Sequence, residues 1–185
     1  LKKWIFPLFS QPIDQNHKNM KIGVLREGKN PPDKRIPLSP EQCREIVEKN
    51  KNVDLVVQPS SVRKFKDSEY ENQGIKLQDD LSDCDVIISV KEVPIDMLIP
   101  NKMHFFFSHT IKEQPYNRKL MQAVLEKNIA LVDWETLTKP NGVRLIGFGR
   151  YAGIVGTYNG FLAWGKRFDA YDIKAANEIG RAHVW

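Results

Sequence analysis

The stretch DVIISVKEVPIDMLIPNKMHFFFSHT, residues 85–110, contains the two runs that decide the fold. These runs are DVIISV, residues 85–90, and KMHFFFS, residues 102–108. Both have the length of a strand, and neither alternates polar with apolar residues as a half-exposed strand does. We therefore predict two central strands that are buried on both faces of a sheet.

Further strands are predicted on either side of this stretch. Apolar runs rich in β-branched residues occur at 21–25, 53–58 and 129–134. After the last of these, the sequence KPNGVRL turns back through Asn141 and Gly142, a dipeptide typical of short hairpins.

Helices are predicted between the strands. Ser39 is a suitable N-cap, Pro40 fits the first helical position and Gln42 completes a capping box. This helix should run to about Asn50, where the apolar periodicity ends.

Two more helical segments complete the pattern. We expect a short helix that Asp67 caps and Gly74 stops. The segment 114–128 carries apolar side chains at helical spacing that would cover one face of the sheet, namely Tyr116, Leu120, Val124 and Leu125. Alternating strands and helices predict an α/β fold, a mostly parallel sheet with helices on both faces.

Composition limits the class of protein. The chain has 185 residues, 41% of them hydrophobic, and a formal net charge of +5. This suffices for one domain with room for an appendage. The basic residues are scattered among acids, which argues against a nucleic-acid partner. Cys43 and Cys84 lack metal-ligand spacing, so we expect reduced thiols, no metal site and a cytoplasmic enzyme.

The two ends are set apart from the fold. Residues 1–19 lack a starting Met, and their apolar patch, broken by Pro7, is too short for a membrane span. We expect Met20 to be the start and residues 1–19 to be upstream sequence or a disordered leader rather than a targeting peptide. EIGRAHV, 178–184, is the translation of GAGATCGGAAGAGCACACGTC, which resembles a common sequencing adapter. We therefore expect residues 178–185 to derive from an adapter, in preference to a frayed helix end, and the gene to continue.

Polar residues follow several predicted strands directly. In open parallel sheets, ligands bind beyond the carboxyl ends of the strands. Each residue taken singly has an ordinary explanation, as a solvated loop residue, a charged turn or a histidine packed under a loop. Their shared location favours function for the five of them: Arg35, Lys91, Glu92, His109 and Glu135.

These residue types suit one kind of chemistry. An arginine binds a carboxylate through two parallel hydrogen bonds. A desolvated lysine and a histidine can each act as general acid or base near neutral pH. The set fits an amino or keto acid whose carbonyl or imine group must be protonated. No serine nucleophile motif and no metal-ligand cluster in the sequence competes with this interpretation.

Five motifs, in order along the chain, carry a family resemblance. They are KIGVLREGKNPPDKRIPLSP (21–40), VKEVP (90–94), FFFSHTIKEQ (105–114), LVDWETL (131–137) and GVRLIGFGRYAGIVGTYNG (142–160). The sequence resembles the saccharopine dehydrogenase (lysine-forming) and lysine-ketoglutarate reductase group, and more distantly alanine dehydrogenase and the transhydrogenase N-terminal domain. The resemblance covers residues 20 to about 170, and FSHTIK and GRYAG favour the saccharopine enzymes.

The resemblance implies a Rossmann-like N-terminal substrate domain over residues 20–150 and a role for each candidate residue. Arg35 would hold a substrate carboxylate, and Lys91 and His109 would be the acid–base pair. Three carboxylates would tune the charges around them, namely Asp33, Glu92 and Glu135, with Asp33 standing where the family has a glutamate. The implied reaction joins lysine and 2-oxoglutarate by reductive amination with hydride from NAD or NADP, or runs in reverse.

The resemblance also implies that the cofactor binds mainly to a second domain, toward which residues 151–177 would lead. Within the chain, GFGRYAGIVG, 147–156, is the one candidate for a glycine-rich phosphate turn. Its G-x-G-x-x-x-G spacing departs from the dinucleotide fingerprint, and no acidic residue closes a second strand after it. We favour a glycine-rich helix whose smooth face packs against a neighbouring element, formed by Gly153, Gly156, Gly160 and Ala163.

The favoured prediction is an N-terminal, substrate-side piece of a saccharopine dehydrogenase-like oxidoreductase that is inactive alone. Its partner would be a small amino or keto acid, and no membrane partner is expected. The alternatives are an alanine dehydrogenase-like enzyme, a stand-alone amino or keto acid binding module and, less favoured, a transhydrogenase subunit.

Overall fold

The computed structural model describes residues 19–147 and 149–174. The chain divides into two units, with the boundary between Val132 and Asp133. The predicted leader and the predicted adapter-derived tail lie outside the described residues, apart from Asn19. In the described part, no helix is both long and apolar enough to cross a membrane.

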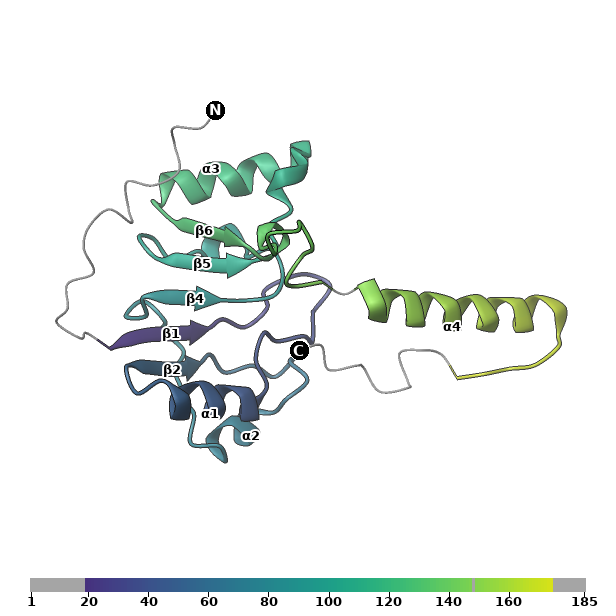
Figure 1. Ribbon diagram of the computed structural model, residues 1–185, viewed down its shortest axis with the longest axis horizontal. Coiled ribbons are helices and arrows are strands. Elements are labelled where there is room, and N and C mark those ends of the chain that lie inside the picture. Colours follow the sequence, from purple (N-terminus) through teal and green to yellow (C-terminus); the bar gives the residue numbers. More distant parts are fainter. Residues whose placement is uncertain (1–18, 148, 175–185) are drawn as a thin grey trace. The chain divides into compact units, whose positions relative to one another are not determined.

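One six-stranded sheet forms the centre of the first unit (Figure 1). Its strand order is β3-β2-β1-β4-β5-β6. The strands are β1 (Met20–Val24), β2 (Val53–Val57), β3 (Lys76–Leu77), β4 (Val86–Ile88), β5 (Met103–Phe106) and β6 (Ala130–Asp133). β1 pairs in parallel with β2 on one side and β4 on the other, and the β2–β3 and β4–β5 ladders are parallel too. The predicted parallel sheet is therefore confirmed, while the two-residue β3 was not predicted.

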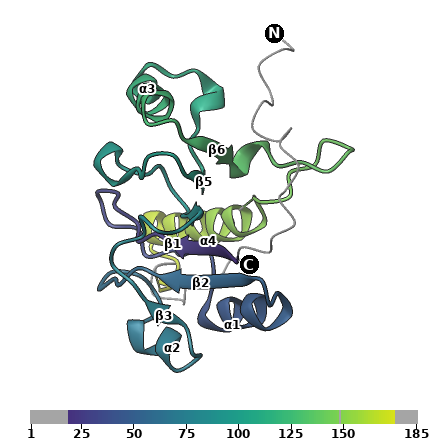
Figure 2. The same cartoon turned by 90° about the vertical axis from the view of Figure 1, so that its left-hand side faces the viewer.

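Helices cover both faces of this sheet, as predicted. Leu55 and Val57 of β2 belong to one core cluster, together with Cys43 of α1 (Pro40–Lys49) and Tyr70 of α2 (Asp67–Glu71). Val56, between them, belongs to the other cluster, which contains residues of α3 (Arg118–Glu126). Because successive side chains of a strand point to opposite faces, these clusters lie on opposite sides of the sheet. Figure 2 shows α1 and α3 on the two sides.

The beginning of α1 agrees with its sequence signals. The Ser39 side chain accepts a hydrogen bond from the Gln42 amide, and the Gln42 side chain accepts one from the Ser39 amide. Asp67 was wrongly predicted as the cap of the next helix, because α2 has Lys66 at that position and Asp67 as its first helical residue. The Asp67 carboxylate instead pairs with Arg63, as described below.

The helix over 114–128 is shorter than predicted. Pro115–Asn117 form a 3-10 turn (η3), and α3 begins only at Arg118. Two of the four residues predicted to face the sheet, Leu120 and Val124, are buried. The other two were predicted wrongly, since Tyr116 is 67% and Leu125 is 68% exposed.

The second unit begins with the 3-10 turn η4 (Trp134–Thr136) and contains the predicted reversal. Gly142 has φ +80°, and a single antiparallel bridge joins Thr138 to Arg144. The glycine-rich segment forms α4 (Gly149–Phe168). A Cβ atom added at Gly153, Gly156 or Gly160 would meet nothing within 4 Å, so no described residue of the second unit packs closely on these glycines.

Candidate active site

The predicted site residues of the first unit follow three neighbouring strands. β2 and β3 lie on one side of β1, whereas β4, β5 and β6 lie on the other. The strand order therefore reverses between β1 and β4, and open α/β sheets bind ligands beyond the carboxyl ends of the strands at such a point. Four of these residues lie in the connections after β1 and β4, namely Asp33 and Arg35, and Lys91 and Glu92, while His109 follows β5.

Glu92 and His109 are brought together by β4 and β5. Nδ1 of His109 lies 2.5 Å from Oε1 of Glu92, and both side chains are 21% exposed. Lys29 adds a second cation, with its Nζ 3.3 Å from Oε2 of Glu92. Burial opposes ionisation of Glu92, but the hydrogen bond with His109 and the charges of His109 and Lys29 outweigh it and lower the pKa of Glu92 below its usual value.

The backbone places the His109 ring at this position. His109 has φ +55° in the left-handed region, which non-glycine residues adopt rarely. Its carbonyl accepts a hydrogen bond of 3.1 Å from the Asn117 side chain. Its ring stacks on Phe107, with centroids 6.3 Å apart. The apolar run before His109 thus ends in a tight turn that presents the imidazole at the sheet edge.

Asp33 and Arg35 form an ion pair in the connection after β1. Nε of Arg35 donates to Oδ1 of Asp33 at 2.9 Å and to Oδ2 at 3.2 Å, and Nη2 also bonds Oδ2. These hydrogen bonds are the main reason that the pKa of Asp33 lies below its usual value. The Arg35 side chain remains 39% exposed, so a carboxylate from solution can reach the guanidinium.

Lys91 lies partly buried beside these pairs. Burial lowers the pKa of its ammonium group, and the positive charge of Arg35 lowers it further, while Glu92 opposes both. Its Nζ forms no hydrogen bond within residues 19–147 and 149–174. A lysine in such surroundings loses its proton more readily than one in water, as a general base requires.

The sequence analysis missed Glu27, which is part of this cluster. Its carboxylate accepts the backbone N–H groups of Val90 at 2.6 Å and of Lys91 at 3.0 Å. Burial raises the pKa of Glu27 to about 7, although both N–H groups and Arg35 oppose that effect. Its place three residues after β1 was a usable signal, because it lies at the same sheet edge as the other candidates.

A groove adjoins the Glu92–His109 pair and has a volume of about 450 Å³. Charged groups at its wall are Lys29, Glu92 and Lys119. Gly28 lets its loop approach this wall closely, since an added Cβ would lie 2.9 Å from Cγ of Pro94 and would collide with Met97. The groove is large enough for an amino acid side chain.

Glu135 belongs to the second unit. It lies in η4, directly after β6, and its side chain is 6% exposed. Oε1 of Glu135 accepts from Nη2 of Arg144 at 2.9 Å, and its backbone N–H donates to Asp133.

The described residues do not form a dinucleotide site. A glycine-rich phosphate turn needs a strand directly before the helix. The residues before α4 contribute only the isolated bridge at Arg144, and no strand leads into Gly147 and Gly149. The connection after β1 is long and reaches α1 only at Pro40. It contains four prolines, counting Pro40, and lacks the closely spaced glycines of a phosphate turn. A nicotinamide cofactor therefore finds no fitting phosphate cradle here.

The arrangement at the sheet edge is nonetheless suited to proton transfer beside a bound carboxylate. It combines an accessible guanidinium, a partly desolvated lysine and a histidine whose Nδ1 faces a carboxylate. Residues 23–155 match the family described as alanine dehydrogenase/PNT, N-terminal domain. The chain belongs to this family. Its fold and the order of its motifs agree with that membership.

Relatives of this alanine dehydrogenase/PNT N-terminal domain include longer proteins of lysine metabolism. The chain is 36% identical over 168 residues to the mitochondrial alpha-aminoadipic semialdehyde synthase of Bos taurus, covering 90% of this chain and 18% of that protein. It is 31% identical over 147 residues to a saccharopine dehydrogenase [NAD(+), L-lysine-forming] of Schizosaccharomyces pombe, covering 76% of this chain and 39% of that protein. The chain thus spans well under half the length of these relatives.

A solved structure shares the fold of this domain. An L-alanine dehydrogenase superposes with a TM-score of 0.54 and 22% sequence identity, covering 66% of this chain and 34% of that one. This likeness shows that the chain shares the α/β fold of part of that enzyme. It carries no information about substrate.

Proposed function

We propose that this domain binds the carboxylate of an amino or keto acid and supplies the proton transfers of an oxidoreductase that joins lysine to 2-oxoglutarate, or runs that reaction in reverse. The observation that carries the proposal is the grouping of Lys91, the Glu92–His109 pair and Arg35 beyond neighbouring parallel strands. The names of the bovine and fission-yeast relatives, a synthase and a dehydrogenase of lysine metabolism, support the choice of substrates.

In this proposal the residues have distinct tasks. Arg35 binds a substrate carboxylate, with Asp33 holding the guanidinium in orientation. Lys91 accepts a proton from the attacking amine, which must be neutral to attack the ketone carbon. His109 donates a proton to the developing oxygen to give the carbinolamine hydroxyl and takes one back from the carbinolamine nitrogen. Lys91 then returns its proton to the hydroxyl, which leaves as water as the iminium forms. Glu92 keeps the His109 proton on Nδ1 and leaves Nε2 toward the substrate.

In this proposal, the cofactor is bound by the full-length protein and not by this domain alone. We propose NAD or NADP as its cofactor, supported by the NAD(+) in the name of the fission-yeast relative. The described residues offer it no phosphate cradle, so residues 20–176 alone should form no saccharopine.

The proposal also covers the cellular compartment of the protein and the molecules that it binds. We propose a cytoplasmic enzyme whose only partners are its small substrates, with neither nucleic acid nor membrane bound. The name of the bovine relative points to the mitochondrion instead. Imaging of the full-length protein with a C-terminal fluorescent tag distinguishes the two compartments.

The decisive experiment measures saccharopine formation by the full-length protein from lysine, 2-oxoglutarate and NADH or NADPH. Lys91→Met and His109→Gln should each lower kcat by roughly a hundredfold or more, because general acid–base groups contribute on that scale. Glu45→Gln, on the exposed face of α1, is the control and should change nothing. Unchanged rates in both site variants would disprove the assigned roles.

Other substrates separate this proposal from its alternatives. Turnover with alanine and pyruvate, without turnover of lysine, would indicate an alanine dehydrogenase-like enzyme. The family description includes that enzyme. Binding of keto acids by calorimetry without any turnover of the full-length protein would indicate a binding module.

A further inference from the structure

The carboxylate of Glu27 takes the place of a backbone acceptor in the sheet. β1 ends at Val24, and the Leu25 N–H still donates to the Ile88 carbonyl at 2.9 Å. In a regular parallel ladder, the next bond would run from the Val90 N–H to the Leu25 carbonyl. The Val90 N–H instead donates to Oε1 of Glu27 at 2.6 Å. The Glu27 side chain therefore supplies the acceptor that the Leu25 carbonyl would supply in a regular ladder, and it extends the pairing of β1 with β4 by one hydrogen bond.

The second carboxylate oxygen holds the next peptide group. Oε2 of Glu27 accepts the Lys91 N–H at 3.0 Å. On the other side, the Val90 carbonyl accepts the Phe107 N–H at 3.0 Å. The Val90–Lys91 peptide plane is thus fixed at both its N–H and its carbonyl. A planar peptide held at both ends restricts the direction in which the Cα–Cβ bond of Lys91 leaves the backbone.

The charged groups around Glu27 belong to the same cluster. Arg35 contributes a positive charge and Asp33 a negative charge near the Glu27 carboxylate. The same carboxylate accepts the backbone N–H of Lys91. Placing a carboxylate in a partly buried position is unfavourable unless its hydrogen bonds compensate. The two backbone N–H groups and the charge of Arg35 offset part of this cost, and burial still raises the pKa of Glu27 to about 7. Neither bond involves the side chain of Lys91.

We propose that Glu27 is a positioning residue for Lys91, acting through the Val90 and Lys91 amides to direct the side-chain nitrogen of Lys91 toward the substrate held by Arg35. This inference rests on the proposed function for the identity of the substrate. The geometric part, that the carboxylate of Glu27 fixes the Lys91 backbone, stands on the contacts alone.

Two variants and one control test the inference in the full-length protein. Glu27→Gln keeps the length of the side chain and one acceptor oxygen, but its NH₂ group faces an N–H and cannot accept from it. Glu27→Asp keeps the charge but is one methylene too short to reach both amides, and it replaces the first variant if that one does not fold. Glu45→Gln, whose side chain pairs with exposed Lys49, is the matched control.

The first measurement follows the Val90 and Lys91 amide protons by NMR as the pH is varied, with no ligand present. In the unaltered protein both should titrate together with the Glu27 carboxyl, whose pKa burial raises to about 7. This titration should disappear in Glu27→Gln and persist in Glu45→Gln. Lys91 amide and Nζ resonances that are the same in Glu27→Gln as in the unaltered protein would overturn the inference.

The second measurement follows saccharopine formation. A misplaced general base lowers kcat, and we expect a loss on the order of tenfold to a hundredfold for Glu27→Gln. The KM for 2-oxoglutarate, which reports on Arg35, should change much less. An unchanged kcat and pH profile would overturn the catalytic part of the inference. If the unaltered protein forms no saccharopine, the proposed function fails, while the NMR measurement still decides the structural part.

Discussion

Nδ1 of His109 lies 2.5 Å from Oε1 of Glu92, although seventeen positions and the whole of β5 separate the two residues in sequence. The contact exists because β4 and β5 are parallel neighbours, so the residues that follow them meet at one edge. A histidine held in this way by a carboxylate keeps one tautomer. In the proposed reaction, Nε2 is then the nitrogen that exchanges a proton with the substrate.

Replacing Glu92 tests this orientation. Glu92→Gln retains an acceptor for Nδ1 but removes the negative charge beside the imidazole ring. We expect kcat for saccharopine formation to fall by about tenfold or more, with a smaller change in KM. Steady-state kinetics across pH values provide the measurement. A variant with the kcat of the unaltered protein at every pH would show that the pair is structural.

Arg35→Lys tests carboxylate binding. A lysine keeps the positive charge but loses the planar fork that binds both carboxylate oxygens. We expect the Kd for 2-oxoglutarate, measured by calorimetry on the full-length protein, to rise by roughly tenfold to a hundredfold. Arg44→Lys, an exposed arginine of α1, is the control. Equal affinities for Arg35→Lys and the unaltered protein would remove Arg35 from the site.

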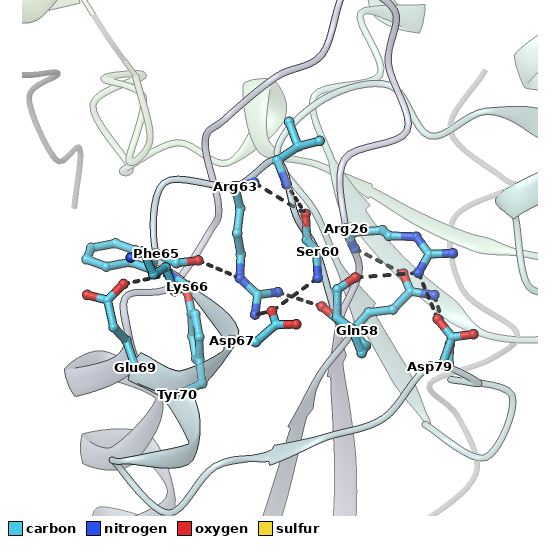
Figure 3. Close-up of polar contacts among 12 residues, drawn as sticks. Arg26, Gln58, Ser60, Arg63, Phe65, Lys66, Asp67, Glu69, Tyr70 and Asp79 are labelled. Atoms are coloured by element: carbon cyan, nitrogen blue, oxygen red, sulfur yellow. Dashed lines mark hydrogen bonds and ion pairs between the residues drawn. The ribbon is translucent and has the colours of Figure 1, made fainter.

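Arg63 anchors the loop after β2, and its removal should destabilise the fold (Figure 3). Its side chain is 3% exposed, donates to the carbonyls of Gln58 and Phe65, and pairs with Asp67. Its guanidinium also lies 4.5 Å from the centroid of the Tyr70 ring. Asp67 is 36% exposed, so the main loss on removing Arg63 is the donor to the buried Gln58 carbonyl. Leaving such an acceptor unpaired costs about 1–3 kcal/mol, so Arg63→Leu should lower the free energy of unfolding by that amount.

Arg26 provides the matched control for this measurement in the same figure. It pairs with Asp79 at 2.7 Å, but the side chains are 43% and 73% exposed. Exposed pairs contribute about 1 kcal/mol at most, so Arg26→Leu should unfold at nearly the same denaturant concentration as the unaltered protein. Equal losses in the two variants would contradict the role of burial.

His104 makes stability depend on pH. It is fully buried in β5, and its Nε2 lies 3.1 Å from the Ile99 carbonyl. Its Nδ1 has no hydrogen-bond partner among the described residues. Burial lowers the pKa of His104, a shift that Lys127 adds to and the Ile99 carbonyl opposes. The imidazole is therefore neutral in the folded protein where an exposed histidine would be protonated.

The sign of the effect follows from this shift. Because the folded pKa lies below the unfolded value of about 6.5, the contribution of His104 to stability is complete above that pH. It is lost as the pH falls toward the folded pKa, by up to about 1.4 kcal/mol per pH unit. Urea unfolding measured from about pH 7 down to about pH 5 spans the unfolded pKa of about 6.5. Over this range, His104→Phe should reduce the dependence of the free energy of unfolding on pH. An identical slope in both proteins would show that His104 does not titrate in this way.

The fold could be predicted where local signals agree with the tertiary structure. The capping box of Ser39 and Gln42 is complete within four residues, so no distant contact was needed to find it. The helix over 114–128 was less predictable, because Pro115 begins a 3-10 turn that shifts the register of the later helix. Leu125 faces water for another reason, because it follows Leu120 by five positions in the same helix and so lies about 140° around the axis from it.

The candidate site was only partly predictable, for a similar reason. Lys91 and His109 follow apolar runs directly, so their position at the sheet edge could be read from the sequence. Glu27 sits in a polar loop, and its contacts with Val90 and Lys91 depend on strand pairing across 63 and 64 positions. The place of Glu135 in a separate unit also had no signal in the local sequence.

All the site residues of the first unit lie in connections between strands, and none of them contributes to either core cluster. Substitutions in these loops should therefore change the chemistry of the sheet edge while leaving the apolar packing of both clusters in place. The proposed substrate preference and the stability of the domain are then separable properties, each open to change without the other.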